Sequence, residues 1–484
     1  MDGDVLVVGA GPTGLAVACG LQAAGIATTV VDGAAGPAVT SRALGLQPRG
    51  VEVLDRLGAL GDLPDRALPI NKVLITVEGR ELARLQVGMA MERLGKRTGL
   101  IISQAAIEGQ LRTRLAELGG TIEWGRRVAA LDRGADGVTA RFEDGSEVDA
   151  AWVIGADGAH SVVRKVSNVG FPGVPLVERF LLADVRADLD MPRDSASTWI
   201  RGPELLAAFP LPGDIWRLMA PAPPGQSDQP QQDEIVGFLG ARLRGEAGGS
   251  IRSVEWTSSF RIQRRLADTY RCGRVLLAGD AAHIHSPLGG QGMNTGIGDA
   301  ENLAWKLALV IDGRASDGLL DTYEAERRPI AKDVLESTSG LTEIVVGDSW
   351  FARFVRDRVG VPLLNLGVVQ RLIGEKASQL QVSYRNGPLG AGRGRLLPGL
   401  RPGDRVPDRD GLYDALGPAW ALLGPEPLAG LARARLGDVV ALRGDGDALL
   451  VRPDGHLAWR GADAAGLRAW LDGALGRPHG VLTR

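Results

Sequence analysis

The chain has 484 residues, of which 44% are hydrophobic, and a formal net charge of −3. A chain of this length exceeds one ordinary hydrophobic core, so we expect two or three domains. The balanced charge, without a basic run, excludes nucleic acid as a partner, and no apolar run is long enough to cross a membrane. Cys19 and Cys272 form no CxxC pair and no basic leader opens the chain, so we expect a cytoplasmic protein without disulfides or a metal site.

The segment 5–32 has the pattern of a strand, a helix and a second strand around a dinucleotide. It opens with four consecutive apolar residues, as a parallel strand buried on both faces does, and Asp32 ends its second strand. Three glycines follow the first strand in the GxGxxG spacing: Gly9, Gly11 and Gly14. The first permits a tight turn, the second lets a pyrophosphate approach the backbone, and the third lets helix and strand pack closely. The pattern predicts a nucleotide site in which Asp32 accepts hydrogen bonds from a ribose.

Two later strands also end in glycine and aspartate. The apolar run 151–154 is followed by the letters GADG, with Asp157 between the glycines, and the run 275–278 is followed by Gly279 and Asp280. An acid held between glycines at the end of a strand suits a ribose or a phosphate-rich ligand at the carboxyl edge of a sheet. Both segments therefore predict ligand contacts of the same kind as the first.

A glycine loop and a helix follow Asp280. Apolar residues recur from Met293 to Ile311 at spacings of three and four, which predicts a helix buried along one face. Three glycines stand immediately before it: Gly289, Gly290 and Gly292. They leave the first N–H groups of the helix open, and that end carries a partial positive charge. The segment predicts an anion or the electron-rich edge of a ring at this junction.

The remaining segments indicate further layers. Short β-like runs between residues 70 and 100 and between 170 and 260 predict a sheet-based domain inserted into the first. Helical patterns dominate from 328 to 380, and a stretch rich in Gly, Pro and Arg marks a boundary near residue 386. The tail alternates short strands with helices and has a hairpin pattern around residues 453–455.

Together the three glycine segments resemble the FAD-dependent aromatic hydroxylases, the single-component flavoprotein monooxygenases related to p-hydroxybenzoate hydroxylase. The resemblance covers most of residues 2–340 and rests on the glycine fingerprint with Asp32, the letters SRALGLQPRGVEVLDRLG at 41–58, Gln104, the GADG motif and the segment GRVLLAGDAAHIHSPLGGQGMNTGIGDAENLAWKL. The letters HSPLGGQGMNTGIGDA, and LVRPDGHLAWR in the tail, more narrowly resemble the bacterial aromatic polyketide hydroxylases. Those carry a C-terminal thioredoxin-like domain without redox cysteines, and this tail has no cysteine.

The resemblance implies an α/β fold with three parts. A Rossmann-like FAD-binding domain with a helical extension would comprise residues 1–70, 101–170 and 260–385. A substrate-binding β-sheet domain would comprise residues 71–100 and 171–259. A thioredoxin-like C-terminal domain, 386–484, would pack against the body or another subunit without a catalytic role.

The resemblance also implies which residues hold FAD. For the nucleotide half, Gly9 to Gly14, with Pro12 and Thr13, would contact the pyrophosphate, and Asp32 with Gly33 the adenosine ribose. The family usually has Glu at the position of Asp32, so the reach of this contact would differ.

For the flavin half, Arg42 and Gln104 would contact the phosphate–ribityl region, and Gly279 with Asp280 the ribityl chain. Asp157 resembles the acid that handles both FAD and NADPH. The loop after Asp280 would border the isoalloxazine, whose N1/C2 edge becomes negative on reduction, through Pro287, Gly290, Gly292, Met293 and Asn294.

The activity implied is hydroxylation of a polycyclic aromatic polyketide, a phenol or quinone, in secondary-metabolite biosynthesis. NADPH or NADH would reduce FAD, which would react with O₂ to a C4a-hydroperoxide and transfer one oxygen atom to the ring. The protein would supply position, electrostatics and a dry pocket. Because the chain has no second complete GxGxxG unit, the nicotinamide would bind transiently near the FAD domain.

No motif marks a general base. His283 and His285 flank the cofactor loop, and we expect them to orient it rather than to transfer protons. Arg84 and Arg97 are weak pocket candidates. Better ones lie in the inserted β-rich segment, although core packing is the default role for each alone: Trp199, Arg201, Phe209, Trp216 and Arg217.

Other functions stay open at this point. Baeyer–Villiger oxygenation of a polyketide ketone would use the same scaffold, because the outcome depends on which substrate atom faces the flavin. A non-oxygenating FAD reductase is a third possibility. A halogenase is disfavoured because no WxWxIP-like stretch occurs, and a plain NAD-dependent dehydrogenase would not need Asp280 and its glycine loop. Monomer and homo-oligomer are both compatible with the sequence.

Overall fold

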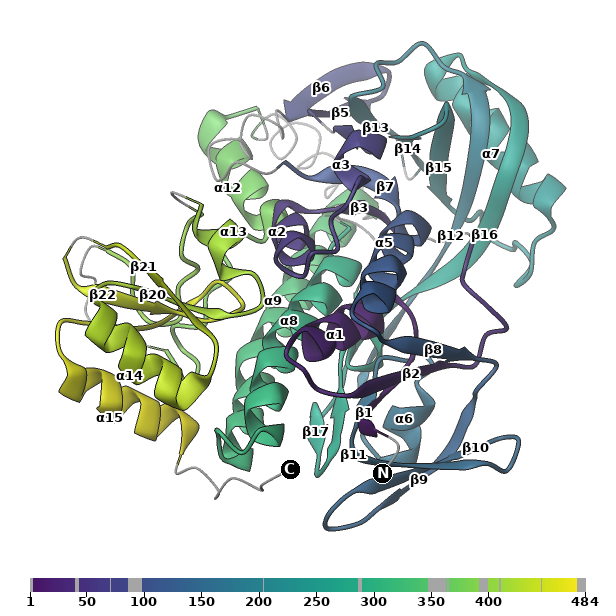
Figure 1. Cartoon of the computed structure of the whole chain (residues 1–484). Coiled ribbons are helices and arrows are strands. Elements are labelled where there is room, and N and C mark those ends of the chain that lie inside the picture. Colours follow the sequence, from purple (N-terminus) through teal and green to yellow (C-terminus); the bar gives the residue numbers. More distant parts are fainter. Residues whose placement is uncertain are drawn as a thin grey trace.

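The computed structural model describes residues 3–39, 43–69, 71–85, 98–202, 204–285, 290–346, 363, 365–390, 399–408, 411–444 and 446–476. Figure 1 shows three bodies: a parallel sheet with helices, a large second sheet, and a smaller domain formed by the end of the chain. Within these residues, no helix has both the length and the apolar character that crossing a membrane requires.

The parallel sheet is built around β1, whose residues are buried. Its parallel strands follow the order β18, β11, β1, β2, β8, and β17, β10 and β9 extend it in antiparallel pairs. The strand bounds are β1 Gly3–Val8, β2 Thr28–Asp32, β8 Thr121–Trp124, β9 Val128–Arg133, β10 Val138–Phe142, β11 Glu147–Gly155, β17 Arg271–Cys272 and β18 Val275–Leu277. The α/β fold with a parallel sheet that the sequence predicted is confirmed.

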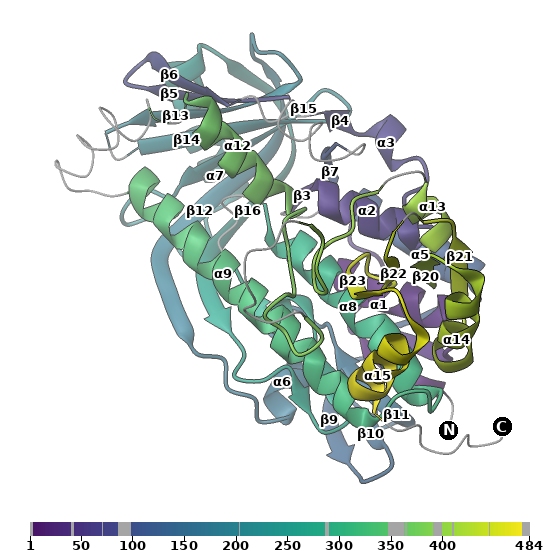
Figure 2. The same ribbon diagram turned by 90° about the vertical axis from the view of Figure 1, so that its left-hand side faces the viewer.

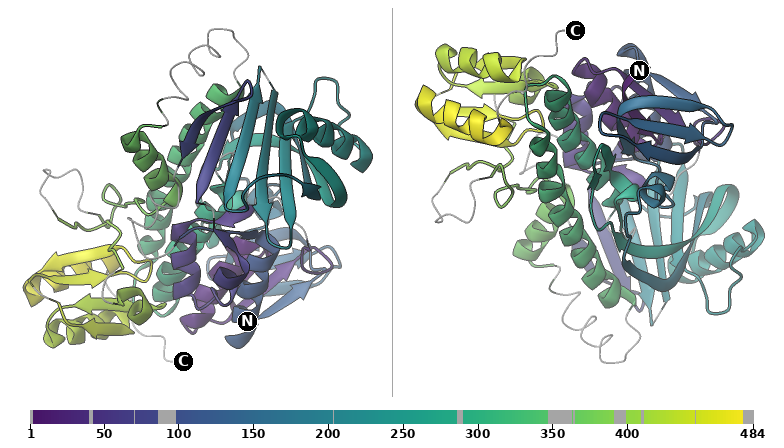
Figure 3. Two further views of the ribbon diagram at one scale, coloured as in Figure 1. Left: turned by 90° about the horizontal axis from the view of Figure 1, so that it is seen from above. Right: turned by 90° about the horizontal axis from the view of Figure 1, so that it is seen from below.

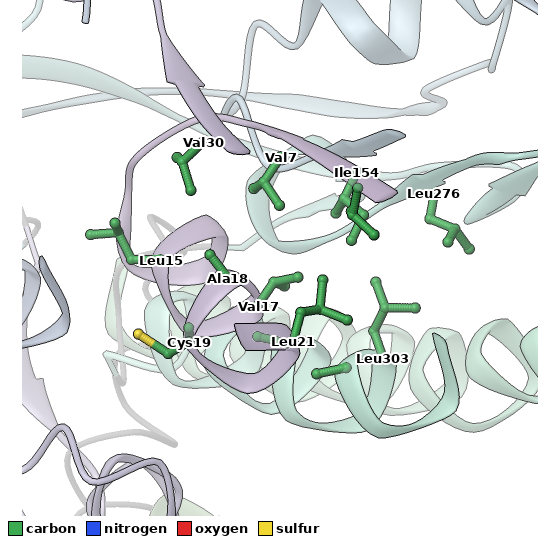
Figure 4. Packing of buried hydrophobic residues seen from close by; sticks show 14 of the residues in the cluster. Val7, Leu15, Val17, Ala18, Cys19, Leu21, Val30, Ile154, Leu276 and Leu303 are labelled. Carbon is green, nitrogen blue, oxygen red and sulfur yellow. The ribbon is translucent and has the colours of Figure 1, made fainter. Parts of the chain in front are cut away.

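Helix α1 (Pro12–Ala23) packs between this sheet and helix α8 (Gly292–Ile311). Figure 4 shows Leu21 of α1 near Leu303 of α8, with Val7 and Ile154 on the sheet side; all four are buried. The two helices approach closely because a Cβ at Gly20 would stand only 2.7 Å from the Ala304 Cβ. Cys19 belongs to the same layer, where burial raises the pKa of its thiol to about 12, so it acts as a small core residue.

Further elements cover the other side of α1. A small sheet in the order β3, β7, β4 joins helices α2, α3 and α5 to this body. The bounds are β3 Leu44–Leu46, α2 Pro48–Arg56, α3 Leu63–Arg66, β4 Leu68–Pro69, β7 Leu100–Ser103, α5 Gln104–Glu117 and α6 Val162–Val166.

The second sheet has the order β19, β16, β12, β15, β14, β13, β5, β6. Helix α7 (Gln232–Ala247) packs on one face, and α12 (Gly367–Ser378) lies on the opposite side in Figures 1 and 2. The strand bounds are β5 Lys72–Val77, β6 Arg80–Leu85, β12 Gly173–Asp188, β13 Ser195–Arg201, β14 Glu204–Leu211, β15 Ile215–Pro221, β16 Ser250–Leu266 and β19 His283–Ile284. Strand β16 runs through the expected boundary at residue 259, and its last residues pair with β19.

Helix α8 is more deeply buried than its sequence predicted. The apolar spacing indicated burial along one face, whereas nearly every residue from Asn294 to Leu309 is buried. Polar residues of α8, such as Asp299 and Lys306, are buried because charged partners on surrounding elements meet them. After α8 come the short η2 (Asp317–Leu320) and the long α9 (Asp321–Val346), as the helical pattern predicted.

The last domain has a mixed sheet in the order β21, β20, β22, β23, in which β22 runs antiparallel to both neighbours. This is the thioredoxin-like arrangement that was expected, and it lies against α8 and α9 (Figure 3). The hairpin around 453–455 is confirmed by the Gly455 N–H, which donates to Arg452 O at 2.9 Å. The bounds are α13 Leu412–Leu416, β20 Trp420–Leu423, α14 Glu426–Leu436, β21 Val439–Leu442, β22 Ala448–Val451, β23 Leu457–Gly461 and α15 Ala464–Leu475.

Candidate active site

The three glycine segments meet at one edge of the parallel sheet. Strands β18, β11, β1 and β2 are neighbours, so their carboxyl ends and the loops that follow share this edge. The Thr13 Oγ1 atom at the start of α1 lies 2.6 Å from where a Cβ at Gly279 would stand and 2.3 Å from one at Gly296. The first helix, the loop after β18 (η1, Gly279–Ala281) and α8 therefore meet at this one side chain.

The three fingerprint glycines have different surroundings. Gly9 has φ +110°, and a Cβ there would stand 2.3 Å from Ala156 O. A Cβ at Gly14 would stand 2.0 Å from Gly9 O. A Cβ at Gly11 would meet nothing within 4 Å. Packing therefore requires glycine at the outer two positions, whereas the middle position faces open space at the N-terminus of α1.

Asp32 is fixed at the end of β2 by backbone donors. The Ala10 N–H donates to Oδ2 and the Ala34 N–H to Oδ1, each at 2.8 Å. Each carboxylate oxygen keeps a further lone pair for a ligand hydroxyl. The neighbouring Gly33 packs against Arg127, whose guanidinium Cζ is 3.2 Å from where a Gly33 Cβ would stand.

Asp157 has one occupied and one free carboxylate oxygen. Its Oδ2 accepts the Val162 and Val163 N–H groups at 2.7 and 3.1 Å and so caps helix α6. Its Oδ1 is buried and has no hydrogen-bond partner in the part of the chain that the structure describes. Because buried polar atoms are normally satisfied, this oxygen indicates a donor that a ligand would bring.

Gln104 is the first residue of α5, and its side chain contacts Glu108, a residue that the sequence analysis did not identify. Its Nε2 donates to Glu108 Oε1 at 2.8 Å. Burial raises the pKa of Glu108, and the hydrogen bond from Gln104 acts in the opposite direction. The side-chain carbonyl oxygen of Gln104 can still accept a hydrogen bond from a ligand.

Asp280 lies exposed between β18 and the glycine loop. Among the described residues, no donor is found within hydrogen-bond distance of its carboxylate. The side chain is accessible, but the dense protein around it partly desolvates the carboxylate and raises its pKa, and the nearby His283 acts in the opposite direction. An accessible acid at this position suits the hydroxyl groups of a ligand.

The first turn of α8 is open at Gly292, where the nearest atom to a Cβ would be His285 Cδ2 at 4.0 Å. The Asn294 side chain is used to fix the loop. Its Oδ1 accepts the Gln47 N–H at 2.8 Å and its Nδ2 donates to Gly290 O at 3.0 Å. Met293 is partly buried against the main core. The backbone, rather than these side chains, is therefore what the helix start offers to a ligand.

Asp299 of α8 connects the loop after β18, His283 and Arg327 through hydrogen bonds, although the sequence analysis did not identify it. Its Oδ2 lies 2.6 Å from His283 Nε2 and accepts the Gly279 N–H at 3.1 Å, and its Oδ1 accepts Arg327 Nε at 2.7 Å. Burial alone would raise the pKa of Asp299, but His283 and Arg327 lower it to about 2. The only sign of this role in the sequence is an acidic residue within an otherwise apolar helical segment.

The five pocket candidates divide between the two faces of the second sheet. Trp199 and Trp216 lie in the cluster under α7. Arg201 is exposed and pairs with Glu246 at 3.0 Å. Phe209 packs on the opposite face, and Arg217 lies beside it there because the two residues are register partners.

The face opposite α7 is apolar and aromatic. Its cluster consists of Val77, Ala83, Phe180, Leu182, Ile200, Leu205, Ala207 and Met219, with Ile75, Leu82, Phe209, Trp256 and Phe260 partly buried against it. Arg217 is buried on this face and donates to both Asp184 oxygens at 2.7 Å. The face therefore has aromatic rings near the Arg217–Asp184 ion pair.

Five of the predicted residues remain: the pocket candidates Arg84 and Arg97, and the cofactor candidates Arg42, Pro287 and Gly289. Arg84 is exposed and pairs with Glu81 at 2.8 Å. Arg42, Pro287, Gly289 and Arg97 lie outside the described residues.

The described residues fit FAD. Space at Gly11 suits a pyrophosphate, the free Asp157 oxygen and the exposed Asp280 suit hydroxyl groups, and the α8 start suits the flavin edge. A dinucleotide-type site at the edge of a parallel sheet, with a second sheet that has an aromatic face, defines the class of two-sheet FAD-binding proteins.

Comparison with known proteins identifies the family. The chain matches the model "FAD binding domain" over residues 2–338 and the model "Aromatic-ring hydroxylase, C-terminal" over residues 419–478. It is 36% identical to 12-dehydrotetracycline 5-monooxygenase/anhydrotetracycline 6-monooxygenase of Streptomyces rimosus subsp. rimosus, covering 97% of this chain and 98% of that protein. It is 31% identical to dialkyldecalin synthase of Streptomyces rugosporus, covering 98% of both.

A solved ternary complex of aklavinone-11 hydroxylase with FAD and aklavinone is also similar. Its TM-score is 0.79 at 26% identity, and the match covers 98% of this chain and 99% of that chain. The chain belongs to the FAD-binding aromatic-ring hydroxylase family and is a FAD-dependent monooxygenase.

Proposed function

We propose that this monooxygenase hydroxylates a polycyclic aromatic polyketide in secondary metabolism. The reaction consumes the aromatic substrate, O₂, NAD(P)H and a proton, and yields the hydroxylated product, water and NAD(P)⁺. Support for the substrate class comes from the relative named for dehydrotetracycline and anhydrotetracycline and from the hydroxylase solved with aklavinone.

The observation that carries the proposal is the continuity between the aromatic face and the cofactor loop. Strand β16 carries Trp256 and Phe260 on that face, and its end pairs with β19, with Leu266 opposite His283. An apolar and aromatic sheet face that continues to the residues after Asp280 suits a planar polycyclic ring. The same surface would exclude water from the reacting atoms.

Each part of the cofactor site has a role in this proposal. The open space at Gly11 would admit the pyrophosphate, Asp32 would accept from the adenosine ribose, and Asp280 would accept from the ribityl chain. The start of α8 would stabilise negative charge at the flavin edge. Bound FAD would supply the two-electron chemistry with NAD(P)H and O₂.

We also propose that NADPH or NADH is the reductant and that the protein is cytoplasmic. A nicotinamide that binds transiently near the FAD domain is consistent with a single GxGxxG unit. We place the protein in the cytoplasm, where thiols stay reduced, and Cys19 and Cys272 carry free thiols in the structure.

A second candidate is a flavoprotein that does not oxygenate its substrate. The similarity to a protein named dialkyldecalin synthase favours it. Baeyer–Villiger oxygenation is the alternative within the monooxygenases, and it differs in the product rather than in the cofactor site.

The product decides among these functions. The holoenzyme is mixed with NADPH and anhydrotetracycline under ¹⁸O₂, and the product is analysed by mass spectrometry and NMR. Gain of one ¹⁸O as a ring hydroxyl supports hydroxylation, and an inserted ester oxygen indicates the Baeyer–Villiger reaction. An altered product without ¹⁸O would favour the non-oxygenating function.

A pair of phenylalanines tests which sheet face holds the substrate. Phe260 lies on the face opposite α7, whereas Phe238 belongs to α7 and packs on the other face. For Phe260→Ala we expect KM to rise at least about tenfold because the aromatic contact is lost. Phe238→Ala is the matched control and should leave KM unchanged. Equal effects on KM, with retained FAD, would contradict this placement.

A further inference from the structure

Two residues near the cofactor loop carry buried nitrogen atoms without partners. Arg264 has this property at Nε and Nη2, and His285 has it at Nδ1 and Nε2, counting every described residue as a possible partner. His285 is only 9% exposed. Because native proteins satisfy nearly all buried polar atoms, the two Arg264 nitrogens and the protonated ring nitrogen of His285 indicate a ligand that accepts hydrogen bonds.

Strand register brings the two residues together. In the antiparallel pair β16 and β19, Leu266 lies opposite His283 and Arg265 opposite Ile284. One step further in the same register sets Arg264 opposite His285. Directly opposed residues project from the same face of a sheet, so the two side chains share one side. The register therefore places the unpartnered atoms on the same side of the sheet, on facing chain segments.

This location lies between the aromatic face and the start of α8. Phe260 precedes Arg264 by four residues along β16, and residues separated by an even number on a strand share a face. On the other side, a Cβ at Gly292 would stand 4.0 Å from His285 Cδ2. A ligand on the aromatic face and at the flavin edge would thus pass beside Arg264 and His285.

The chemistry of the location suits an oxyanion. The Arg264 guanidinium is a permanent cation with a planar set of donors. Burial and the neighbouring His283, whose ring centroid is 4.7 Å away, hold the pKa of His285 well below its usual range. His285 is therefore neutral at physiological pH, with one N–H to donate. The nearby Asp299 is already paired with His283 and Arg327.

We propose that Arg264 and His285 bind the ionised oxygen of the aromatic substrate, a phenolate or an enolate, and so hold the ring in its electron-rich form beside the flavin. The inference rests on the proposed hydroxylation and names how that substrate is recognised. The substrate O–H bond breaks, its electron pair stays on the oxygen, and the proton passes to solvent. The added electron density on the ring favours transfer of an electrophilic oxygen atom.

The test uses alizarin, 1,2-dihydroxyanthraquinone, a planar phenol whose ionised form absorbs at longer wavelength. Holoenzyme without NAD(P)H is titrated with the dye over a pH series, so that binding is observed without turnover. We expect bound alizarin to ionise at a pH at least about one unit lower than free alizarin, a tenfold shift in its ionisation equilibrium. In Arg264→Gln this shift should disappear, and the ionised dye should bind about 10- to 100-fold more weakly.

Control variants separate the site from general effects of charge. Arg261→Gln removes an arginine from the same strand that is exposed and paired with Asp228 at 2.8 Å, and it should leave the shift unchanged. Arg264→Lys keeps the charge without the planar fork and should retain part of the shift, and His285→Leu should reduce it. FAD content and the thermal midpoint of each variant show whether the fold is intact.

Three results would overturn the inference. The first is wild-type enzyme that does not bind alizarin or binds it only in the neutral form, even if ¹⁸O enters a product. The second is an unchanged shift in Arg264→Gln. The third is weaker binding of NADPH, but not of alizarin, in that variant, because the site would then hold a phosphate of the co-substrate. Failure of the ¹⁸O experiment alone would affect the proposed function and not this binding result.

Discussion

Gly11 and Gly14 belong to one motif but make different demands on the fold. A Cβ at Gly14 would stand 2.0 Å from Gly9 O, whereas a Cβ at Gly11 meets nothing within 4 Å. We therefore expect Gly14→Ala to destabilise the protein by about 1–3 kcal/mol through overpacking. Gly11→Ala should leave the thermal midpoint of the apoprotein unchanged but weaken FAD binding at least about tenfold, because its methyl group takes the pyrophosphate space. Thermal unfolding and FAD fluorescence titration measure the two effects.

Each variant serves as the control for the other. Normal FAD affinity in Gly11→Ala would show that the pyrophosphate lies elsewhere. A stable Gly14→Ala apoprotein would show that the helix–strand contact relaxes without cost.

Individual residues also show what sequence patterns can and cannot predict. The spacing of Gly9, Gly11 and Gly14 reflects a local backbone turn, so the sequence alone could predict this turn at the end of the strand. Asp299 acts through His283 and Arg327, which are distant in the chain, and no local spacing reports such partners. The Asn294 side chain likewise fixes a loop across 247 residues of sequence, through its bond with Gln47.

At the scale of elements, the hairpin between β22 and β23 fixes the last domain to the FAD-binding body. Arg452 donates to the two Glu326 oxygens of α9 at 2.8 and 2.9 Å, and both side chains are fully buried. Lys306 of α8 contacts the same carboxylate at 2.8 Å. Asp454 in the turn accepts Asn302 Nδ2 of α8 at 3.3 Å. The hairpin pattern was predictable, but this buried polar contact with two helices was not.

Removal of one partner from this network should be costly. We expect Arg452→Met to lower the free energy of unfolding by about 3–5 kcal/mol, because the buried Asp454 would lose its guanidinium partner and the buried Glu326 would keep Lys306 as its cationic partner. Arg460 provides a control in the same hairpin: it pairs with Asp447 at 2.9 Å, and both are about half exposed. Arg460→Met should cost about 1 kcal/mol or less. Chemical denaturation followed by tryptophan fluorescence distinguishes these values, and equal costs would contradict the role of the network.

At the scale of the whole molecule, the sequence predicted the kinds of layer better than the connections between them. Strand and helix periodicity indicated the parallel sheet, the inserted sheet and the final domain. The parallel pairing of β5 with β13 joins segments more than 100 residues apart in the chain, and the antiparallel pairing of β16 with the two-residue strand β19 joins the second sheet to the segment after Asp280. Such pairings depend on the folded arrangement, so the direct path from the aromatic face to the cofactor loop appeared only in the structure.

Buried ion pairs in the body of the molecule make its stability depend on acid. Burial alone would raise the pKa of Glu326, but Arg452 and Lys306 lower it from 4.5 to about 2, and His283 and Arg327 lower that of Asp299 from 3.8 to about 2. A carboxylate with a lowered pKa in the folded state stabilises the protein fully above its unfolded pKa, and this contribution is lost as pH falls toward the folded pKa. Together the two groups should lower the free energy of unfolding by about 3 kcal/mol between pH 5 and pH 3.

Chemical denaturation at pH 5, 4 and 3 measures this loss, and a variant attributes it to one group. Glu326→Gln should be less stable at pH 5 because Arg452 and Lys306 lose their charged partner, yet its stability should fall less steeply toward pH 3. Glu147→Gln removes an exposed acid that pairs with Arg141 at 2.7 Å and should keep the wild-type slope. If the stability of the wild type stays constant or rises from pH 5 to pH 3, the buried carboxylates have the same pKa in the folded protein as in the unfolded chain. In that case the ion pairs between the hairpin, α8 and α9 would not be what resists acid.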